Sequence, residues 1–221
     1  MQQLRSLEVL EIEILDLLNT NRILPMIYFG GGTMLRLCHN LNRYSTDLDF
    51  WLDISADSNE LFDQLNSLFS AHYTVSDAAN NKNTLLFEIK SPHVSRSLKI
   101  EIRKEQHNFE WERKIAFSTF TNIQVQVHAL TLNQMMKNKV AAFLSRKIIR
   151  DCYDIEFLLT RGVALAAAKE ELQSMLSLID SFMEKDYKVI LGSILEETDR
   201  RYYSERNFRL LKEEITKKLL E

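Results

Sequence analysis

Two aspartates, Asp47 and Asp49, are the residues of this chain whose type and spacing indicate catalytic chemistry most directly. In an extended strand alternate residues share a face, with roughly 6.5 to 7 Å between their Cα atoms. The two carboxylates can therefore converge on one or two Mg²⁺ ions, which prefer carboxylate oxygens and substrate phosphates. Leu48, Phe50 and Leu52 would point the opposite way into a core. The stretch thus predicts a strand with one polar face and one apolar face.

A run of three glycines precedes the aspartates. Gly30, Gly31 and Gly32 are three of only five glycines in the 221 residues, and Thr33 follows them. Glycine tolerates positive φ and close approach of a ligand, so a glycine turn that opens a helix can point amide groups at phosphate oxygens. We expect Gly31 and Gly32 to cradle a phosphate and Thr33 to offer its hydroxyl to the same anion. A glycine run alone is more often a plain turn, and paired aspartates often form a solvated strand face. The conjunction of the two motifs is what favours nucleotide binding.

Glu101 is the candidate third carboxylate. Residues 98–103 alternate apolar and charged side chains, which places Lys99, Glu101 and Arg103 on one face of a predicted strand. If this strand lies beside the strand with the two aspartates, Glu101 joins the metal site and can accept the proton of an attacking hydroxyl. The alternative is that Glu101 is one of three exposed charges on an outer sheet face.

A basic segment lies just past the middle of the chain. Positions 129 to 150 hold five Lys or Arg residues and no Asp or Glu. On a helix, Lys139, Arg146 and Arg150 would fall within about 20° of one line, on the side of apolar residues. We expect these cations to point inward, where phosphate charge would compensate them, with Lys139 as the first choice for phosphate contact. For Arg146 and Arg150, structural ion pairing is an equal alternative. The acids available for such pairing are Asp151, Asp154 and Glu156.

The composition indicates an ordinary globular protein with room for a substantial core, because 45% of the residues are hydrophobic and 27% are charged. A formal charge of −3 argues against a protein that coats nucleic acid through overall basicity. Cys38 and Cys152 form no metal-binding pattern, so we expect reduced thiols in a cytoplasmic protein. No apolar run approaches the roughly 18 residues of a membrane span, and no membrane partner is expected.

The hydrophobic pattern predicts an α+β fold. Helices are expected at residues 3–19, from the glycines to Cys38, and from a capping box at Asp57 to about Ala71. Strands are expected at 26–29, at the two aspartates, and at 73–78, 84–90, 96–104 and 121–127. From a capping box at Thr131 onward, only Gly162 and Gly192 interrupt helical sequence. We therefore expect a mixed sheet with flanking helices at 1–128 and a helical bundle at 129–221.

Three motifs carry a family resemblance. They are Gly31-Gly32-Thr33, Arg43-x-Ser45-x-Asp47-Leu48-Asp49-Phe50, and Lys139-x-x-Ala142-x-x-x-Arg146-x-x-x-Arg150-Asp151-x-x-Asp154. Over residues 20–160 the chain resembles the AbiEii/AbiGii toxin family of the nucleotidyltransferase (polymerase β-like) superfamily. The first two motifs occur widely in that superfamily, and the third points to this family. Thr33 stands where many members carry serine, and Glu101 stands where aspartate is commoner.

The resemblance implies transfer of a nucleoside monophosphate from an NTP to an acceptor, with release of pyrophosphate. In such an enzyme Asp47, Asp49 and Glu101 would hold two Mg²⁺ ions, while the glycines and Thr33 orient the β and γ phosphates. The further nucleotide-binding residues implied are Ser45, Lys139, Arg146, Arg150 and Asp154. Family members act as toxins that a separate antitoxin protein neutralises, and several are similar to enzymes that modify tRNA ends. The expected partners are therefore NTP, an RNA acceptor such as tRNA, and an antitoxin.

Two other functions share part of this pattern. A nucleotidyltransferase that modifies a small molecule such as an antibiotic would carry the first two motifs, but the segment from Lys139 to Asp154 argues against it. A nonenzymatic nucleotide-binding or regulatory module would need no metal ligands, and the intact pair of aspartates disfavours it.

Overall fold

The computed structural model describes residues 2–105, 107–195 and 197–220 and divides into two compact units. The sheet unit comprises Met1–Asn40 and Tyr44–Leu130, and the helical unit comprises Leu41–Arg43 and Thr131–Glu221. The expected division lay between residues 128 and 129. The sequence did not indicate that the tripeptide Leu41–Arg43 packs with the C-terminal helices, because its partners lie more than a hundred residues away in the chain.

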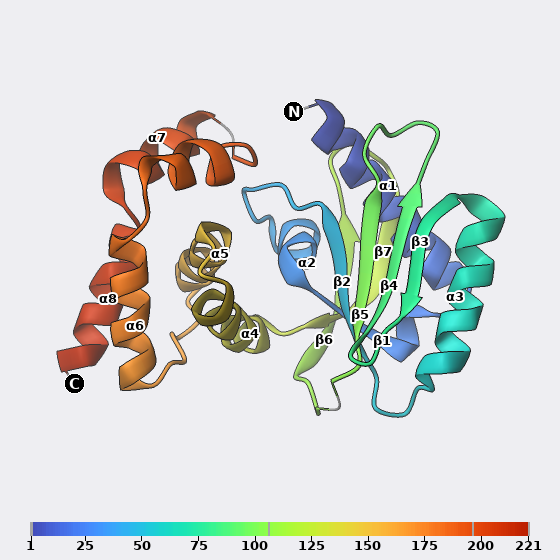
Figure 1. The fold of residues 1–221 in the computed structure, drawn as a ribbon, viewed down its shortest axis with the longest axis horizontal. Helices are drawn as coiled ribbons and strands as arrows, with labels where there is room; N and C mark the ends of the chain where they lie inside the picture. Colours follow the sequence, from blue (N-terminus) through green and yellow to red (C-terminus); the bar gives the residue numbers. More distant parts are fainter. Residues whose placement is uncertain (1, 106, 196, 221) are drawn as a thin grey trace. The chain divides into compact units, whose positions relative to one another are not determined.

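A seven-stranded mixed sheet forms the centre of the sheet unit (Figure 1). Its strands are β1 (Ile27–Gly30), β2 (Asp47–Leu52), β3 (Thr74–Asn80), β4 (Thr84–Lys90), β5 (Leu98–Arg103), β6 (Trp111–Phe117) and β7 (Gln124–Leu130). They are ordered β3-β4-β5-β2-β1-β7-β6. β2 runs parallel to β5 and β1 parallel to β7, and the other neighbours are antiparallel. The predicted α+β class with a mixed sheet is confirmed.

β6 was not predicted from the sequence. It is an edge strand that pairs only with β7, and it contains three consecutive charged residues, Glu112, Arg113 and Lys114. Its large apolar side chains are exposed, among them Trp111 and Ile115. Because neither face of the strand is fully buried, its sequence lacks the apolar and polar alternation that identifies a half-buried strand.

The helices of the sheet unit are α1 (Gln2–Thr20), the short 3₁₀ helix η1 (Leu24–Met26), α2 (Gly31–His39) and α3 (Ser58–His72). α1 lies behind the sheet in Figure 1, and α3 lies beside β3. Asp57 caps α3 as expected, because its Oδ1 accepts hydrogen bonds from the amides of Asn59 (2.7 Å) and Glu60 (3.0 Å).

The sheet has one apolar face and one polar face around β2 and β5. Leu48, Phe50 and Ile100 are buried on the apolar face. Asp47 and Asp49 alternate with the apolar residues of β2 and are half-buried on the other face. Lys99, Glu101 and Glu88 of the neighbouring strands lie on the same side of the sheet. We call these five residues the acidic face. The alternation predicted for both strands is therefore what presents the carboxylates.

The helical unit contains α4 (Leu132–Arg146), α5 (Ile149–Thr160), α6 (Lys169–Asp180), the π-helix η2 (Asp186–Leu191), α7 (Glu197–Arg206) and α8 (Arg209–Leu220). Thr131 caps α4, its hydroxyl accepting from the Gln134 amide at 3.2 Å. Phe143, Leu158 and Phe208 are among its buried core residues. The predicted C-terminal helical bundle is confirmed. In the segments that the structure describes, no helix is long and apolar enough to cross a membrane.

Candidate functional site

The glycine turn joins β1 directly to α2. Gly31 has a φ of 74°, in the left-handed region, and a Cβ atom at this position would collide with the carboxylate of Asp49. Gly30 lies opposite Asp49 in the antiparallel pairing of β1 and β2. Glycine is therefore required at position 31 for two reasons, the backbone angle and the close approach of the Asp49 side chain.

Thr33 fastens the first turn of α2 to β2. Its side chain is fully buried, and its hydroxyl donates a hydrogen bond of 2.7 Å to the carbonyl oxygen of Asp47. We expected this hydroxyl to contact phosphate, and in the structure its proton is used in a contact with the backbone. Thr33 thus acts on the geometry of the turn and of the strand that carries the aspartates.

The strand register brings Glu101 beside the two aspartates. β5 runs parallel to β2, with Lys99 opposite Asp47 and Glu101 opposite Asp49. The condition under which Glu101 would join the metal site, that its strand adjoins the aspartate strand, is therefore met. Within the described ranges, however, no group of three or more Asp, Glu, His or Cys side chains is placed to hold a single metal ion. The register alone does not assemble a three-carboxylate site.

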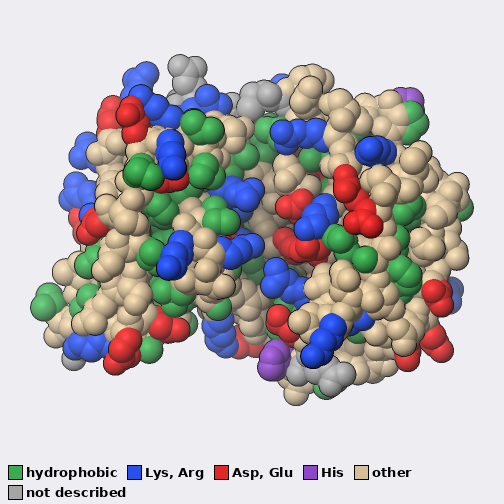
Figure 2. Space-filling view, viewed as in Figure 1, with side chains coloured by type: hydrophobic (Ala, Val, Ile, Leu, Met, Phe, Trp, Pro, Cys, Tyr) green, Lys and Arg blue, Asp and Glu red, His purple; other side chains and the backbone are tan. Residues whose placement is uncertain are grey.

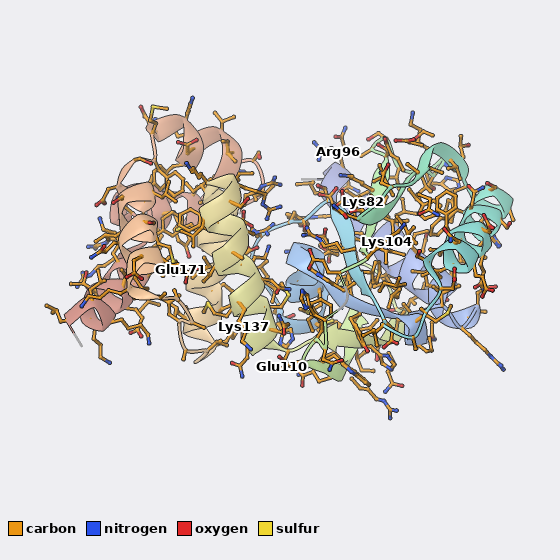
Figure 3. All side chains as sticks on the ribbon, turned by 60° about the horizontal axis from the view of Figure 1, so that its bottom comes forward. Lys82, Arg96, Lys104, Glu110, Lys137 and Glu171 are labelled. Atoms are coloured by element: carbon orange, nitrogen blue, oxygen red, sulfur yellow. The ribbon has the colours of Figure 1, made fainter. Side chains whose placement is uncertain are left out.

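Lys99 lies among these acids and forms an ion pair with Glu101, in which Nζ and Oε1 are 2.5 Å apart. The hydrogen bond with Glu101 raises the pKa of Lys99, and the negative charges of Glu101, Asp47 and Asp49 raise it further against the opposing effect of burial. Lys99 was expected on this face of the strand, without a predicted role. Arg96, labelled in Figure 3, is exposed in the loop that leads into β5 and is a second basic residue near this end of the strand.

The donor set of the acidic face fits a divalent cation. Asp47 and Asp49 present carboxylate oxygens from alternate positions of one strand, and both remain partly exposed. Mg²⁺ is usually bound by one or two carboxylates, with water and substrate phosphates as its other ligands. Asp47 and Asp49 would therefore hold the ion. The glycine turn lies beside them, because a side chain at position 31 would collide with the Asp49 carboxylate.

Two basic residues of the third motif, Lys139 and Arg146, belong to a set of charges in the helical unit that we call the ion network. Its members are Arg43, Lys139, Arg146, Asp151 and Asp154. The Arg43 guanidinium donates through Nε and Nη2 to the two carboxylate oxygens of Asp154 at 2.6 and 2.7 Å. Lys139 Nζ lies 2.6 Å from Asp154 and 3.5 Å from Asp151, and Arg146 lies 2.7 Å from Asp151. All but Arg146 are buried.

The ion network changes the interpretation of Lys139. We expected phosphate to compensate its charge, and in the structure Asp154 and Asp151 do so. The alternative that Arg146 pairs with a nearby acid is confirmed, since Asp151 is its partner. Arg150 is half-buried. Contact of these cations with a nucleotide stays a prediction.

Burial and charge act in opposite directions on Asp154. Burial alone would raise the pKa of its carboxyl group, but the charges of Arg43 and Lys139 and the hydrogen bonds from them outweigh burial and hold the pKa below its ordinary value. Asp154 is therefore ionised and fully paired. Its partner Arg43 stands four residues before Asp47, and Ser45 between them is half-buried. The tripeptide that joins α2 to the approach of β2 is thus anchored on α5.

The helical unit also contains a groove. A groove of about 800 Å³ is lined by residues of α4 and α6, including Leu144, Glu170 and Ser177. Glu171, labelled in Figure 3, also lines it and accepts from the Ala168 amide at the start of α6. None of the residues expected to bind nucleotide or metal lines this groove.

Comparison with known proteins extends these observations. A family model described as nucleotidyl transferase AbiEii toxin, type IV TA system, matches residues 15–219. A crystal structure from H. pylori, of a protein with a provisional assignment as a nucleotidyltransferase, aligns with a TM-score of 0.53 at 17% identity and covers 87% of this chain and 88% of that chain. The structure of JHP933 from Helicobacter pylori aligns with a TM-score of 0.48 at 18% identity and covers 87% and 86%. No curated protein sequence matches.

The likeness to the structure that aligns with a TM-score of 0.53 supports the fold, and the family match covers residues of both units. The family match confirms the resemblance that was drawn from the three motifs. Because the family model spans nearly the whole sequence, the chain belongs to the AbiEii family of nucleotidyl transferase toxins of type IV toxin–antitoxin systems.

Proposed function

We propose that this protein is a Mg²⁺-dependent nucleotidyltransferase that transfers a nucleoside monophosphate from an NTP to an RNA acceptor, with tRNA as the first candidate. The observation that carries the proposal is the pairing of Asp47 and Asp49 on the acidic face beside the Gly31 turn. Two carboxylates beside a glycine turn can bind a triphosphate together with its metal ions, because the carboxylates bind the metal and the glycine amides can bind phosphate oxygens.

Each residue of the acidic face has a separate task in this proposal. Asp47 and Asp49 would bind two divalent cations, which supply charge stabilisation for the leaving pyrophosphate and lower the pKa of the attacking hydroxyl. Gly31 and Gly32 would point their backbone amides at the phosphates, and Thr33 holds their turn against β2. Glu101 would complete the acidic group as a ligand or as the acceptor of the hydroxyl proton.

The residues of the third motif would act on the charge around the triphosphate. We propose that Lys139 contacts phosphate by exchanging one of its two carboxylate partners, and that Ser45 contacts the triphosphate from the approach to Asp47. We propose that the charges of Arg146, Arg150 and Asp154 also contribute to nucleotide binding. In the structure Arg146 and Asp154 belong to the ion network, in which Asp154 and Asp151 neutralise the cations.

The family implies a nucleotide substrate and an antitoxin partner. On the face shown in Figure 2, acidic and basic side chains are interspersed, in keeping with the net charge of −3. Broad electrostatic capture of RNA would then be weak, and acceptor binding should depend on a local group of side chains. We propose action in the cytoplasm, where NTP and tRNA are available together.

The activity is tested by incubating the purified protein with each labelled NTP, Mg²⁺ and total tRNA. Transfer of label to RNA is the expected result. Transfer only to a small drug-like acceptor would instead support an antibiotic-modifying enzyme, and binding of NTP without transfer would support a regulatory module.

Substitution of Asp49 tests the residue basis of the proposal. Asp49→Asn should lower transfer on the order of 10³-fold, because loss of a metal ligand removes several kcal/mol of charge stabilisation in the transition state. Asp77→Asn changes an exposed aspartate on β3 of the same sheet and should leave the rate unchanged. A rate retained in Asp49→Asn would remove this residue from the metal site.

A further inference from the structure

Lys99 lies between acids on both neighbouring strands. The register puts it opposite Asp47 of β2 and opposite Glu88 of β4. Glu101 follows two residues later on the same face of β5. Four carboxylates therefore share the acidic face with this ammonium group. A positive charge at this place belongs to the protein itself and is present before any metal ion binds.

Lys99 is engaged with one of these acids in particular. Its Nζ lies 2.5 Å from Oε1 of Glu101, with the side chains 44% and 26% exposed. Glu88 has a different partner, since it accepts a hydrogen bond from the hydroxyl of Ser97. The exposed fraction shows that the ion pair is reachable by solvent and by ions, so it can influence what binds there.

We propose that Lys99 is a positioning residue that holds Glu101 outside the coordination sphere of the metal, leaving a cation site of two carboxylates, Asp47 and Asp49. This inference rests on the proposed function and assigns Glu101 to proton acceptance. It agrees with the finding that the described residues contain no ligating group of three or more. Glu101 lies opposite Asp49 in the strand register, but its carboxylate forms an ion pair with the ammonium group of Lys99.

The consequence concerns the order of binding. The number of charged ligands is a main determinant of divalent cation affinity, and Mg²⁺ keeps several waters when only two carboxylates bind it. A site with only two charged ligands binds the bare ion weakly, because the ion pair with Lys99 keeps the third carboxylate from contributing. The triphosphate then supplies the missing negative charge. The protein thus takes up the ion together with the nucleotide and binds little of it beforehand.

The test measures binding of Mn²⁺ alone to the full chain, without nucleotide, by the electron paramagnetic resonance signal of free Mn²⁺. Glu101→Gln should leave the affinity of the parent protein almost unchanged. Lys99→Met should tighten binding roughly tenfold, since it releases Glu101 as a third charged ligand, and the number of charged ligands tunes divalent cation affinity over orders of magnitude. In Lys99→Met/Glu101→Gln most of that gain should be lost, because no third carboxylate is left to bind the ion.

Two further variants control for fold and for charge. Lys99→Arg keeps the cation and should behave as the parent. Lys114→Met removes a lysine with the same spacing to a glutamate on β6, where Nζ of Lys114 and Oε1 of Glu112 are 3.4 Å apart, and should leave Mn²⁺ binding unchanged.

The outcomes separate this inference from the proposed function. Weakening of the parent by Glu101→Gln to the extent caused by Asp49→Asn would overturn the inference, since Glu101 would then already be a ligand. A gain in Lys99→Met that persists in the double variant would overturn it too, since simple repulsion would explain the gain. Mn²⁺ binding that ignores Asp49→Asn would overturn the metal site itself and the proposed function with it.

Discussion

The acidic face and the ion network both contain a pair of closely spaced aspartates, and the two pairs have opposite environments. Asp47 and Asp49 are half-buried on a strand beside a lysine that is paired with another residue. Asp151 and Asp154 are buried on α5, in contact with Arg43, Lys139 and Arg146. Three built-in cations neutralise the second pair. The difference in burial is instructive: the buried aspartates are enclosed among the protein's own cations, whereas the half-buried ones keep exposed surface that an external cation can reach.

The same contrast applies to the motifs. The segment from Lys139 to Asp154 carried the most specific part of the predicted family resemblance, yet in the structure its charged residues are mostly committed to one another and to Arg43. In this chain the motif thus supplies paired charges that stabilise the helical unit. Whether those charges contact substrate depends on how completely they are already paired.

Removal of Asp154 should give the largest change in stability. Asp154→Ala leaves Arg43 and Lys139 buried without their main partner, and loss of one member of a buried ion pair costs about 3–5 kcal/mol in the free energy of unfolding. Asp49→Asn, on the partly exposed acidic face, should cost less than about 1 kcal/mol. Urea unfolding followed by circular dichroism measures both. Equal losses in the two variants would contradict the contrast between the regions, and failure of Asp154→Ala to fold would be its extreme form.

Gly31→Ala should give an intermediate effect with a specific signature. The alanine must adopt a left-handed φ and would also collide with the Asp49 carboxylate, at a cost of about 1–3 kcal/mol. Gly162→Ala is the matched control, because Gly162 has a φ of 77° with nothing near its Cβ direction. It should cost only about 1 kcal/mol. Nucleotidyl transfer should fall in the first variant alone, and equal transfer rates would show that the close approach to Asp49 is dispensable.

Substitution of Glu11 on α1 should give the smallest change in stability. Glu11 is a third kind of acid for the comparison, because it is buried and nearby positive charge does not outweigh the effect of burial on its pKa. Burial raises its pKa well above the ordinary 4.5, and the charge of Glu8 raises it further. Its Oε1 has no hydrogen-bond partner among the described atoms. The folded state therefore binds the proton more tightly than the unfolded state, so stability falls as pH rises above about 4.5.

Glu11→Gln should accordingly stabilise the protein at pH 8 by about 1 kcal/mol, the usual scale for an unsatisfied buried group. The difference in Tm between the variant and the parent should shrink as pH is lowered toward 4.5, where the glutamate of the parent becomes protonated. Differential scanning calorimetry across that range measures it. A difference independent of pH would mean that charge on Glu11 is not the cause.

The local elements could be predicted from the sequence because their causes are local. Alternation predicted the strand that carries Asp47 and Asp49, and the capping residues Asp57 and Thr131 marked two helix starts. The hydrophobic pattern predicted the helix α1, but it did not indicate that Glu8 and Glu11 are buried on it. β6 was missed because an exposed edge strand imposes no burial pattern on its residues.

By itself the sequence determined the glycine turn, the polar face of β2 and the charges available in the third motif, since side-chain chemistry and local periodicity suffice for these. Only the tertiary structure decided that β5 lies parallel to β2, so that Lys99 meets Glu101 beside the aspartates. It also decided that Asp154 reaches back across 111 positions to bind Arg43. Strand order and ion pairs between distant segments depend on which surfaces pack together, and no local pattern records that choice.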